Sequence, residues 1–120
     1  MKFQCPIYPV PFVRARSNGS RRFDDPRYSQ FKKEVAYYAK EAMGKTKPFN
    51  FPVRADITIY KRRHDVWSKN WGDVDNFIKA IFDALNGVVF IDDSQVVEIC
   101  AAKKCGENGV VVEICAADMI

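Results

Sequence analysis

The sequence is poor in the residues that build zinc sites. It has four cysteines and one histidine, and no two cysteines form a Cys-x-x-Cys pair. His64 also lies far from the cysteines along the chain, which argues against a zinc finger or zinc ribbon. The cysteines are therefore expected to be reduced and to serve as small core residues.

Long hydrophobic stretches are also absent. No run approaches the length of a membrane span, and Pro6, Pro9 and Pro11 interrupt the N-terminal segment where a signal peptide needs an unbroken apolar core. We therefore expect a cytoplasmic protein without a membrane partner. With 48% apolar and 28% charged residues among 120, the composition predicts one folded domain and not a disordered chain.

The hydrophobic periodicity predicts the order strand, helix, strand, helix, strand, strand. The expected segments are an edge strand within 3–16, a helix from Pro26 to Met43, a strand over 51–62, a helix that ends at Asn86-Gly87, and two C-terminal strands. A flexible basic loop is expected at about 14–25. We therefore predict a single two-layer α+β domain over residues 1–120, with a mixed β-sheet and two main helices.

The C-terminal strands carry a repeated sequence. Residues 96–102 read Val-Val-Glu-Ile-Cys-Ala-Ala, and residues 111–117 read the same. The connector between them is rich in turn-forming residues, so the two copies are predicted to be the arms of a β-hairpin. Two copies are too few for a repeat fold.

Two acidic groups flank the second predicted helix. Asp73 and Asp75 precede it, and Asp92-Asp93 follow the turn at Asn86-Gly87. Side chains at i and i+2 of an extended segment project to the same side, so the first two carboxylates can share a hard cation such as Mg²⁺. If the chain folds back after the turn, Asp93 can supply a third oxygen. The pattern suits phosphodiester hydrolysis that depends on Mg²⁺, with Mn²⁺ as a substitute.

Lys79 lies one helical turn after Asp75, where its ammonium could neutralise a phosphate oxygen or orient an attacking water. A purely structural interpretation is also open. An aspartate at position 73 or 75 can cap the helix, Lys79 can pair with Asp83, and Asp92-Asp93 can belong to a turn. The pattern alone supports both interpretations about equally.

Basic residues gather in two stretches of a chain whose net charge is +4. The residues expected to contact DNA are Arg14, Arg16, Arg21, Arg22, Arg27, Lys61, Arg62, Arg63 and Lys69. Such clusters suit a phosphate backbone, and a solvated charged face is the alternative. Phe23, Trp67 and Trp71 lie beside these charges, where they could stack on unpaired bases or pack internally.

The segment that begins at Asp73 resembles the signature of the RusA family of Holliday junction resolvases. The family pattern is Asp-x-Asp-Asn-x-x-Lys, then Asp-Ala-Leu, then Asp-Asp-x-Gln-Val, and this chain matches it in type and order, including Asn76 and Asp92. The Asp25-Pro26 pair before a helix also resembles the opening of the family. One departure is the Asn-Trp-Gly segment at 70–72, where members often carry a proline or a basic residue.

The resemblance implies a homodimeric, Mg²⁺-dependent endonuclease that resolves four-way DNA junctions by paired symmetric nicks in recombination and repair, without a small-molecule cofactor. It assigns metal binding and catalysis to Asp73, Asp75 and Asp93, and a supporting catalytic role to Lys79. A four-way junction is roughly two-fold symmetric, so a two-fold dimer would present two matched sites. The alternatives are an inactive protein that binds branched DNA and a nuclease for another branched nucleic acid.

Overall fold

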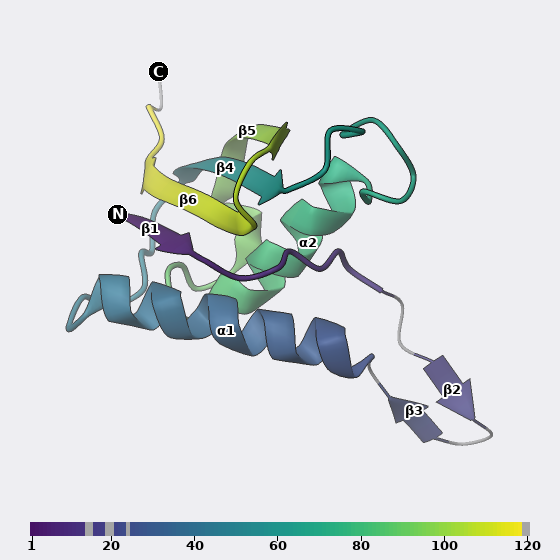
Figure 1. Ribbon diagram of the computed structural model, residues 1–120. Coiled ribbons are helices and arrows are strands. Elements are labelled where there is room, and N and C mark those ends of the chain that lie inside the picture. The colour runs from purple at the N-terminus through teal and green to yellow at the C-terminus, as the bar shows by residue number, and fades with distance from the viewer. Residues whose placement is uncertain (14–15, 19–20, 24, 119–120) are drawn as a thin grey trace.

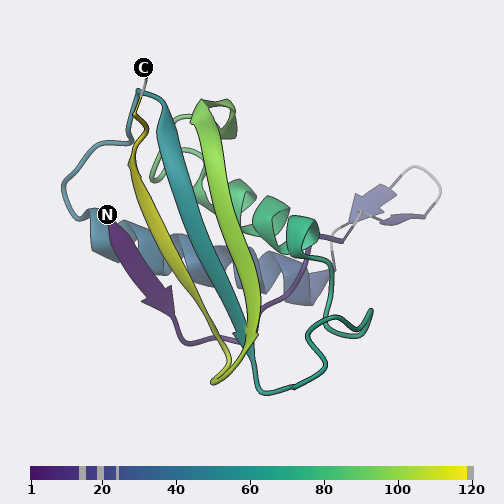
Figure 2. The same cartoon turned by 90° about the horizontal axis from the view of Figure 1, so that it is seen from above.

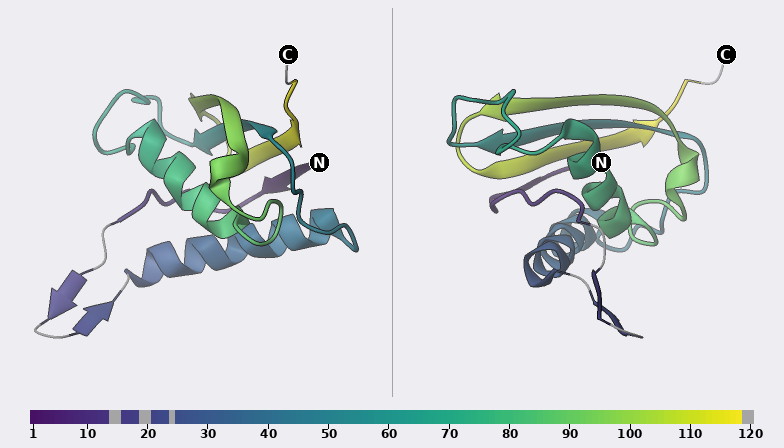
Figure 3. Two further views of the ribbon diagram at one scale, coloured as in Figure 1. Left: turned by 180° about the vertical axis from the view of Figure 1, so that it is seen from behind. Right: turned by 90° about the vertical axis from the view of Figure 1, so that its right-hand side faces the viewer.

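The protein has one sheet layer and one helix layer (Figure 1) in the computed structural model, which describes residues 1–13, 16–18, 21–23 and 25–118. The sheet contains β1 (Lys2–Cys5), β4 (Val53–Lys61), β5 (Val96–Cys105) and β6 (Gly109–Ala116), in the order β1-β6-β4-β5. The helices α1 (Pro26–Met43) and α2 (Val74–Leu85) lie on the same face of this sheet (Figure 3). The predicted two-layer α+β fold with a mixed sheet is confirmed.

The predicted basic loop at about 14–25 contains two short strands. These are β2 (Arg16–Asn18) and β3 (Arg21–Phe23), which pair antiparallel and extend away from the sheet and helices (Figure 1). Arg14 falls outside the described residues, and the flexibility of the segment stays a prediction.

Helix α1 begins and ends as the sequence predicts. The Asp25 side chain caps its first turn by accepting a hydrogen bond of 2.8 Å from the backbone N–H of Arg27, and Pro26 occupies the first helical position. Gly44 follows the last turn with a positive φ of 54°. Both ends are therefore fixed by residues within or next to the helix.

Strand β4 carries the centre of the core. Val53, Ala55, Ile57 and Ile59 alternate along it, and all four are fully buried beneath the helices. This alternation is the one that the sequence predicts. The same parity continues one position further, to Lys61, which is also buried.

Strands β4 and β5 are parallel and are joined through α2, so the three elements form a crossover unit (Figure 2). In such a unit the helix returns in the direction opposite to the strands. The residues before α2 therefore lie at one end of the sheet, and the residues after it lie at the other end. This topology decides where the acidic residues stand.

The predicted C-terminal hairpin is wrong. Strand β4 lies between β5 and β6, pairing parallel with the first and antiparallel with the second. The short connection after Cys105 passes around the end of β4, where the Gly106 N–H donates to the Lys61 carbonyl. The two repeated segments thus flank one strand, and their isoleucines, Ile99 and Ile114, both pair with Ala55.

Three of the four cysteines are not core residues. Cys5 is buried, whereas Cys100, Cys105 and Cys115 are exposed, so the core interpretation holds only for the first. Cys105 lies on the edge strand β5, and its sulfur is 3.4 Å from Nδ1 of His64 although the two are remote in sequence. Among residues 1–13, 16–18, 21–23 and 25–118, no helix is long and apolar enough to cross a membrane.

Candidate functional site

Asp73 stands at the N-cap position of α2, but its side chain makes no capping hydrogen bond. Its backbone carbonyl instead accepts from the N–H groups of Asn76 and Phe77, at 3.1 and 3.3 Å. Asp75 lies in the first helical turn and, like Asp73, is exposed. The helix dipole stabilises both negative charges. Two carboxylates are therefore available to a ligand without loss of the helix cap.

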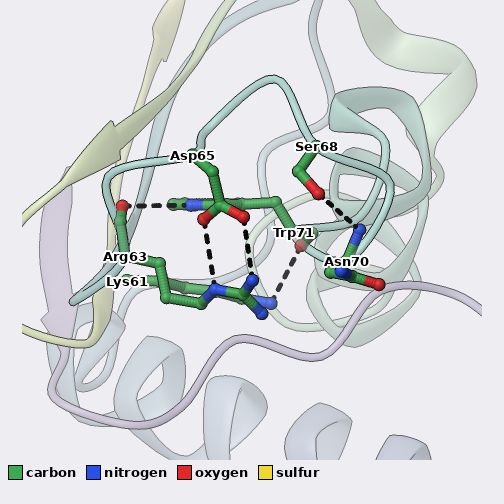
Figure 4. Close-up of polar contacts among 6 residues, drawn as sticks. All are labelled: Lys61, Arg63, Asp65, Ser68, Asn70 and Trp71. Atoms are coloured by element: carbon green, nitrogen blue, oxygen red, sulfur yellow. Dashed lines mark hydrogen bonds and ion pairs between the residues drawn. The ribbon is translucent and has the colours of Figure 1, made fainter.

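The turn before Asp73 is fixed by close packing. Trp71 is fully buried, and its indole N–H donates to the Arg63 carbonyl at 3.3 Å (Figure 4). Gly72 has a φ of 99°, and a Cβ at this position would lie only 2.8 Å from the ring of Phe77. Because only glycine avoids both the strained φ and this clash, the entry into α2 has one backbone path.

Two lysines hold the carbonyl groups of this turn. Lys61 donates from Nζ to the Trp71 carbonyl at 2.9 Å, and Lys103 donates from Nζ to the Gly72 carbonyl at 2.8 Å (Figure 4 shows the first). The two ammonium groups therefore lie against the backbone of the turn that precedes Asp73. This role was not predicted from the sequence, although the inward parity of β4 points to Lys61.

The basic cluster predicts that Lys61 contacts DNA, but its side chain is buried. It is only 3% exposed, and burial lowers its pKa to about 8, with Arg63 and Lys103 adding like-charge repulsion. At neutral pH it is therefore still mainly protonated. Its contacts are internal, so a role in holding the DNA arms is corrected to a role inside the loop.

Lys79 does not make the predicted pair with Asp83. Its ammonium lies 3.9 Å from the ring centroid of Phe12, and Asp83 accepts a hydrogen bond of 2.9 Å from the Tyr28 hydroxyl. A cation above an aromatic face keeps its charge while its position is restricted. Lys79 is thus an exposed, positioned cation one turn from Asp75.

Asp93 belongs to a separate turn. It begins a short 3₁₀ helix, η1 (Asp93–Gln95), and its Oδ2 lies 3.5 Å from Nδ2 of Asn86 at the end of α2. The Oδ1 atom of Asn86 is buried without a hydrogen-bond partner in the described part of the chain. The amide group of Asn86 therefore faces the Asp93 carboxylate through its nitrogen.

The three predicted metal ligands do not meet within one chain. Asp73 and Asp75 lie at the N-terminal end of α2 and Asp93 lies beyond its C-terminal end, and a 12-residue helix is about 18 Å long. Within the described ranges, no group of three His, Cys, Asp or Glu side chains could hold a metal ion. The expectation that the chain folds back to join them is wrong, because the crossover places the two helix ends at opposite ends of the sheet.

The remaining basic residues of the predicted DNA surface differ in their ion pairing and exposure. Arg62 pairs with Glu107, Arg63 pairs with Asp65 at 2.8 Å, and Arg27 is 3.9 Å from Asp25. Lys69 is exposed, whereas the side chains of Arg16, Arg21 and Arg22 lie outside the part of the chain that the structure describes. Of the three aromatic residues, Trp71 packs internally and Trp67 is exposed. Of the predicted DNA-contacting cations that the structure describes, Arg62, Arg63 and Lys69 belong to the segment between β4 and α2, and Arg27 belongs to the start of α1.

Gln95 was not singled out in the sequence analysis and organises the turn at Asp93. Its Oε1 accepts from the N–H groups of Ile91 and Asp92 at 2.9 and 3.0 Å, and its Nε2 donates to the carbonyls of Phe49 and Phe51 at 2.8 and 3.0 Å. The Gln95 side chain thus makes four hydrogen bonds.

We expect Gln95→Ala to lower the free energy of unfolding by about 2–3 kcal/mol, since each lost bond is worth about 1 kcal/mol or less. Urea denaturation measures this change. The matched control is Gln30→Ala, because Gln30 is exposed on α1 and its amide makes one bond of 3.3 Å, to Glu34. Equal stability of the two variants would contradict the role given to Gln95.

Comparison with known proteins identifies the family of the chain. The family model described as endodeoxyribonuclease RusA matches residues 6–115. The uncharacterized protein YqaN of Bacillus subtilis (strain 168) is 31% identical over 124 residues, which cover 85% of this chain and 87% of that protein. The matched region contains both acidic groups and Lys79. The chain therefore belongs to the RusA family of endodeoxyribonucleases, which are Holliday junction resolvases.

Proposed function

We propose that this protein is a homodimeric nuclease that depends on a divalent metal ion and resolves four-way DNA junctions by paired symmetric nicks. The observation that carries the proposal is the pair of exposed carboxylates of Asp73 and Asp75. The Asp73 side chain makes no capping bond, and Asp75 stands one turn from Lys79. Members of the RusA family are generally dependent on divalent metal ions. Paired carboxylates beside a cation suit that chemistry.

A second chain would complete the acid set. A two-fold axis across the middle of α2 reverses this helix in the partner, so that the Asp73 and Asp75 end of one chain meets the Asp93 end of the other. Each dimer would then hold two identical sites, each built from both chains. This arrangement supports the paired cuts that a two-fold symmetric junction requires.

Apolar side chains support this dimer because they flank both acidic groups. Val74 lies between Asp73 and Asp75, and Ile91, Val97 and Ile99 surround Asp93 in sequence. These four side chains are between 38% and 62% exposed. Exposed apolar residues of this kind often mark an interface. Val97 and Ile99 also lie on β5, which is an edge strand of the described sheet and so could pair with a partner.

The dimer would add a third carboxylate to the donor set for a hard cation. Asp73 and Asp75 of one chain with Asp93 of the second chain would give three carboxylate oxygens for Mg²⁺ or Mn²⁺. A cation bound there would activate water and stabilise the leaving oxygen of the cleaved strand. Lys79 would contact the phosphate. The arms of the junction would meet the cations Arg14, Arg16, Arg21, Arg22, Arg27, Arg62, Arg63 and Lys69.

The direct test uses end-labelled synthetic DNA and the purified protein. We expect cleavage of a four-way junction with Mg²⁺, much weaker cleavage of duplex, fork and flap substrates of the same sequence, and loss of cleavage with EDTA. Light scattering should give twice the 13.8 kDa mass of one chain. Tight junction binding without any cleaved strand would instead indicate an inactive DNA-binding protein, and preference for a fork or flap would indicate another branched substrate.

A further inference from the structure

The turn that leads to the acid pair contains a glycine immediately before the first aspartate. Gly72 has a φ of 99° and directly precedes Asp73. Glycine rotates about its backbone bonds more freely than any other residue, so contacts from outside must fix the peptide group that follows it. Within the turn, the Trp71 N–H donates to the Ser68 carbonyl at 3.0 Å and the Gly72 N–H donates to the Lys69 carbonyl at 3.2 Å. These bonds hold the N–H groups of the turn and leave its carbonyl groups to other partners.

Those partners are two lysines on neighbouring strands of the sheet. Lys61 ends β4 and donates to the Trp71 carbonyl at 2.9 Å, and Lys103 of β5 donates to the Gly72 carbonyl at 2.8 Å. Lys103 pairs in register with the buried Ile59, so its side chain leaves the same face of the sheet as that of Lys61. Two consecutive carbonyl groups are therefore tied to two strands.

Neither ammonium group is paired with a carboxylate. Among the described residues, the ion pairs involve neither Lys61 nor Lys103. The ring centroid of Trp71 instead lies 5.2 Å from the Lys61 ammonium and 5.5 Å from the Lys103 ammonium. An aromatic face attracts a cation at such distances. A hydrogen bond from an ionised donor is also roughly twice as strong as one between neutral groups. The carbonyl groups of the turn are therefore held firmly.

We propose that Lys103 is a positioning residue for metal binding, which fixes the acid pair through the Gly72 carbonyl. This carbonyl and the nitrogen of Asp73 belong to one planar peptide group. The Lys103 ammonium therefore sets the plane from which the Asp73 side chain departs. Lys61 holds the preceding peptide group, but it is buried, whereas Lys103 is half-buried on an edge strand and can be replaced with less effect on the core. The inference rests on the proposed function, because it assigns a further residue to the same metal site.

The first test measures amide hydrogen exchange by NMR in Lys103→Met, without metal or DNA. This substitution removes the ammonium and keeps an unbranched side chain. The N–H groups of Asn76 and Phe77 both donate to the Asp73 carbonyl, so a looser peptide group before Asp73 should expose them. We expect both to exchange at least about tenfold faster than in the wild-type protein, because a hydrogen bond from a charged group is lost.

The second test measures the metal directly. Bound Mn²⁺ broadens the amide signals of nearby residues, so a titration followed at Asp73 and Asp75 gives the Mn²⁺ concentration for half of the effect. In Lys103→Met this concentration should rise about tenfold, since residues that orient metal ligands contribute about 10- to 100-fold. The Mg²⁺ concentration for half-maximal junction cleavage should rise by a similar factor. The dissociation constant of the junction without metal should stay unchanged.

The matched control is Lys104→Met, which removes the same charge from the next residue. Lys104 is exposed and pairs with Tyr60, so it faces away from the helices. It should leave amide exchange, Mn²⁺ broadening and cleavage unchanged. Lys103→Arg should recover most of what Lys103→Met loses, because a guanidinium can also donate to a carbonyl oxygen.

Three results would overturn the inference. The first is an equal effect of Lys103→Met and Lys104→Met on Mn²⁺ binding. The second is weaker junction binding by Lys103→Met with unchanged exchange and Mn²⁺ binding, which would make Lys103 a DNA contact. The third is a failure of Lys103→Arg to recover any Mn²⁺ affinity. If wild-type protein cuts no junction, the proposed function fails, whereas the exchange and Mn²⁺ measurements still decide the role of Lys103.

Discussion

Asp73→Asn is expected to lower the rate of junction cleavage by more than about a hundredfold, since even the residues that only orient metal ligands contribute about 10- to 100-fold. The substitution keeps the size of the side chain and removes its charge. Asp73 makes no capping hydrogen bond, so the fold should not change. Junction binding should be unchanged or tighter, because one negative charge near the phosphates is lost.

The matched control for this variant is Asp56→Asn. Asp56 lies on β4 with the parity opposite to the buried positions, so its side chain faces away from the helices, and its substitution changes the net charge by the same amount. Cleavage rates on a labelled junction with Mg²⁺ and dissociation constants without Mg²⁺ give the two readouts. A wild-type cleavage rate for Asp73→Asn would remove Asp73 from the site.

The helices and β4 could be predicted because their signals are local. Asp25, Pro26 and Gly44 fix the ends of α1 within a few residues of the helix itself, and the alternation from Val53 to Ile59 fixes the buried face of β4. At Lys61 the alternation and the charge of the side chain give opposite predictions, and the alternation is right. Its inward parity predicts burial, whereas its place in a basic run suggests a surface residue.

The strand order could not be predicted from sequence in the same way. A short turn-rich connector is compatible with two paired strands or with two strands on either side of a third. The choice depends on pairing with β4, which precedes β5 by more than 30 residues and is therefore a non-local contact. The repeated segments also differ in environment, since Ile114 is buried on a central strand and Ile99 is half exposed on the edge strand.

The acidic residues were identified by type and order, but their arrangement in space was not. The sequence shows that Asp73 and Asp93 flank a helix, and two geometries follow from that. If the chain turned back along the helix after its last turn, Asp93 would approach Asp73. In a parallel crossover the two residues stay a helix length apart. The structure has the crossover. The separation of the carboxylates is thus a consequence of topology, and it is also the reason that a second chain enters the proposed site.

A mixture of Asp73→Asn and Asp93→Asn chains is expected to regain cleavage that neither variant shows alone. In a heterodimer of the two, one site combines both substitutions, whereas the other combines intact Asp73 and Asp75 of one chain with intact Asp93 of the other. Random mixing makes half of the dimers heterodimers, each with one working site, so about a quarter of the wild-type number of sites is restored. Because each heterodimer has one site, the product should be a junction with a single nick.

The control mixture combines Asp73→Asn with Asp75→Asn. Both of these substitutions affect the same half of the acid set, so each site of their heterodimer carries one defect and no cleavage should return. Refolding the two chains together before the assay ensures that the subunits exchange, and labels on different strands separate single nicks from paired cuts. If the Asp73 and Asp93 variants fail to complement each other although mass analysis shows heterodimers, each site lies within one chain. The proposed dimer would then need a rearrangement of α2 that brings Asp93 to its own Asp73 and Asp75.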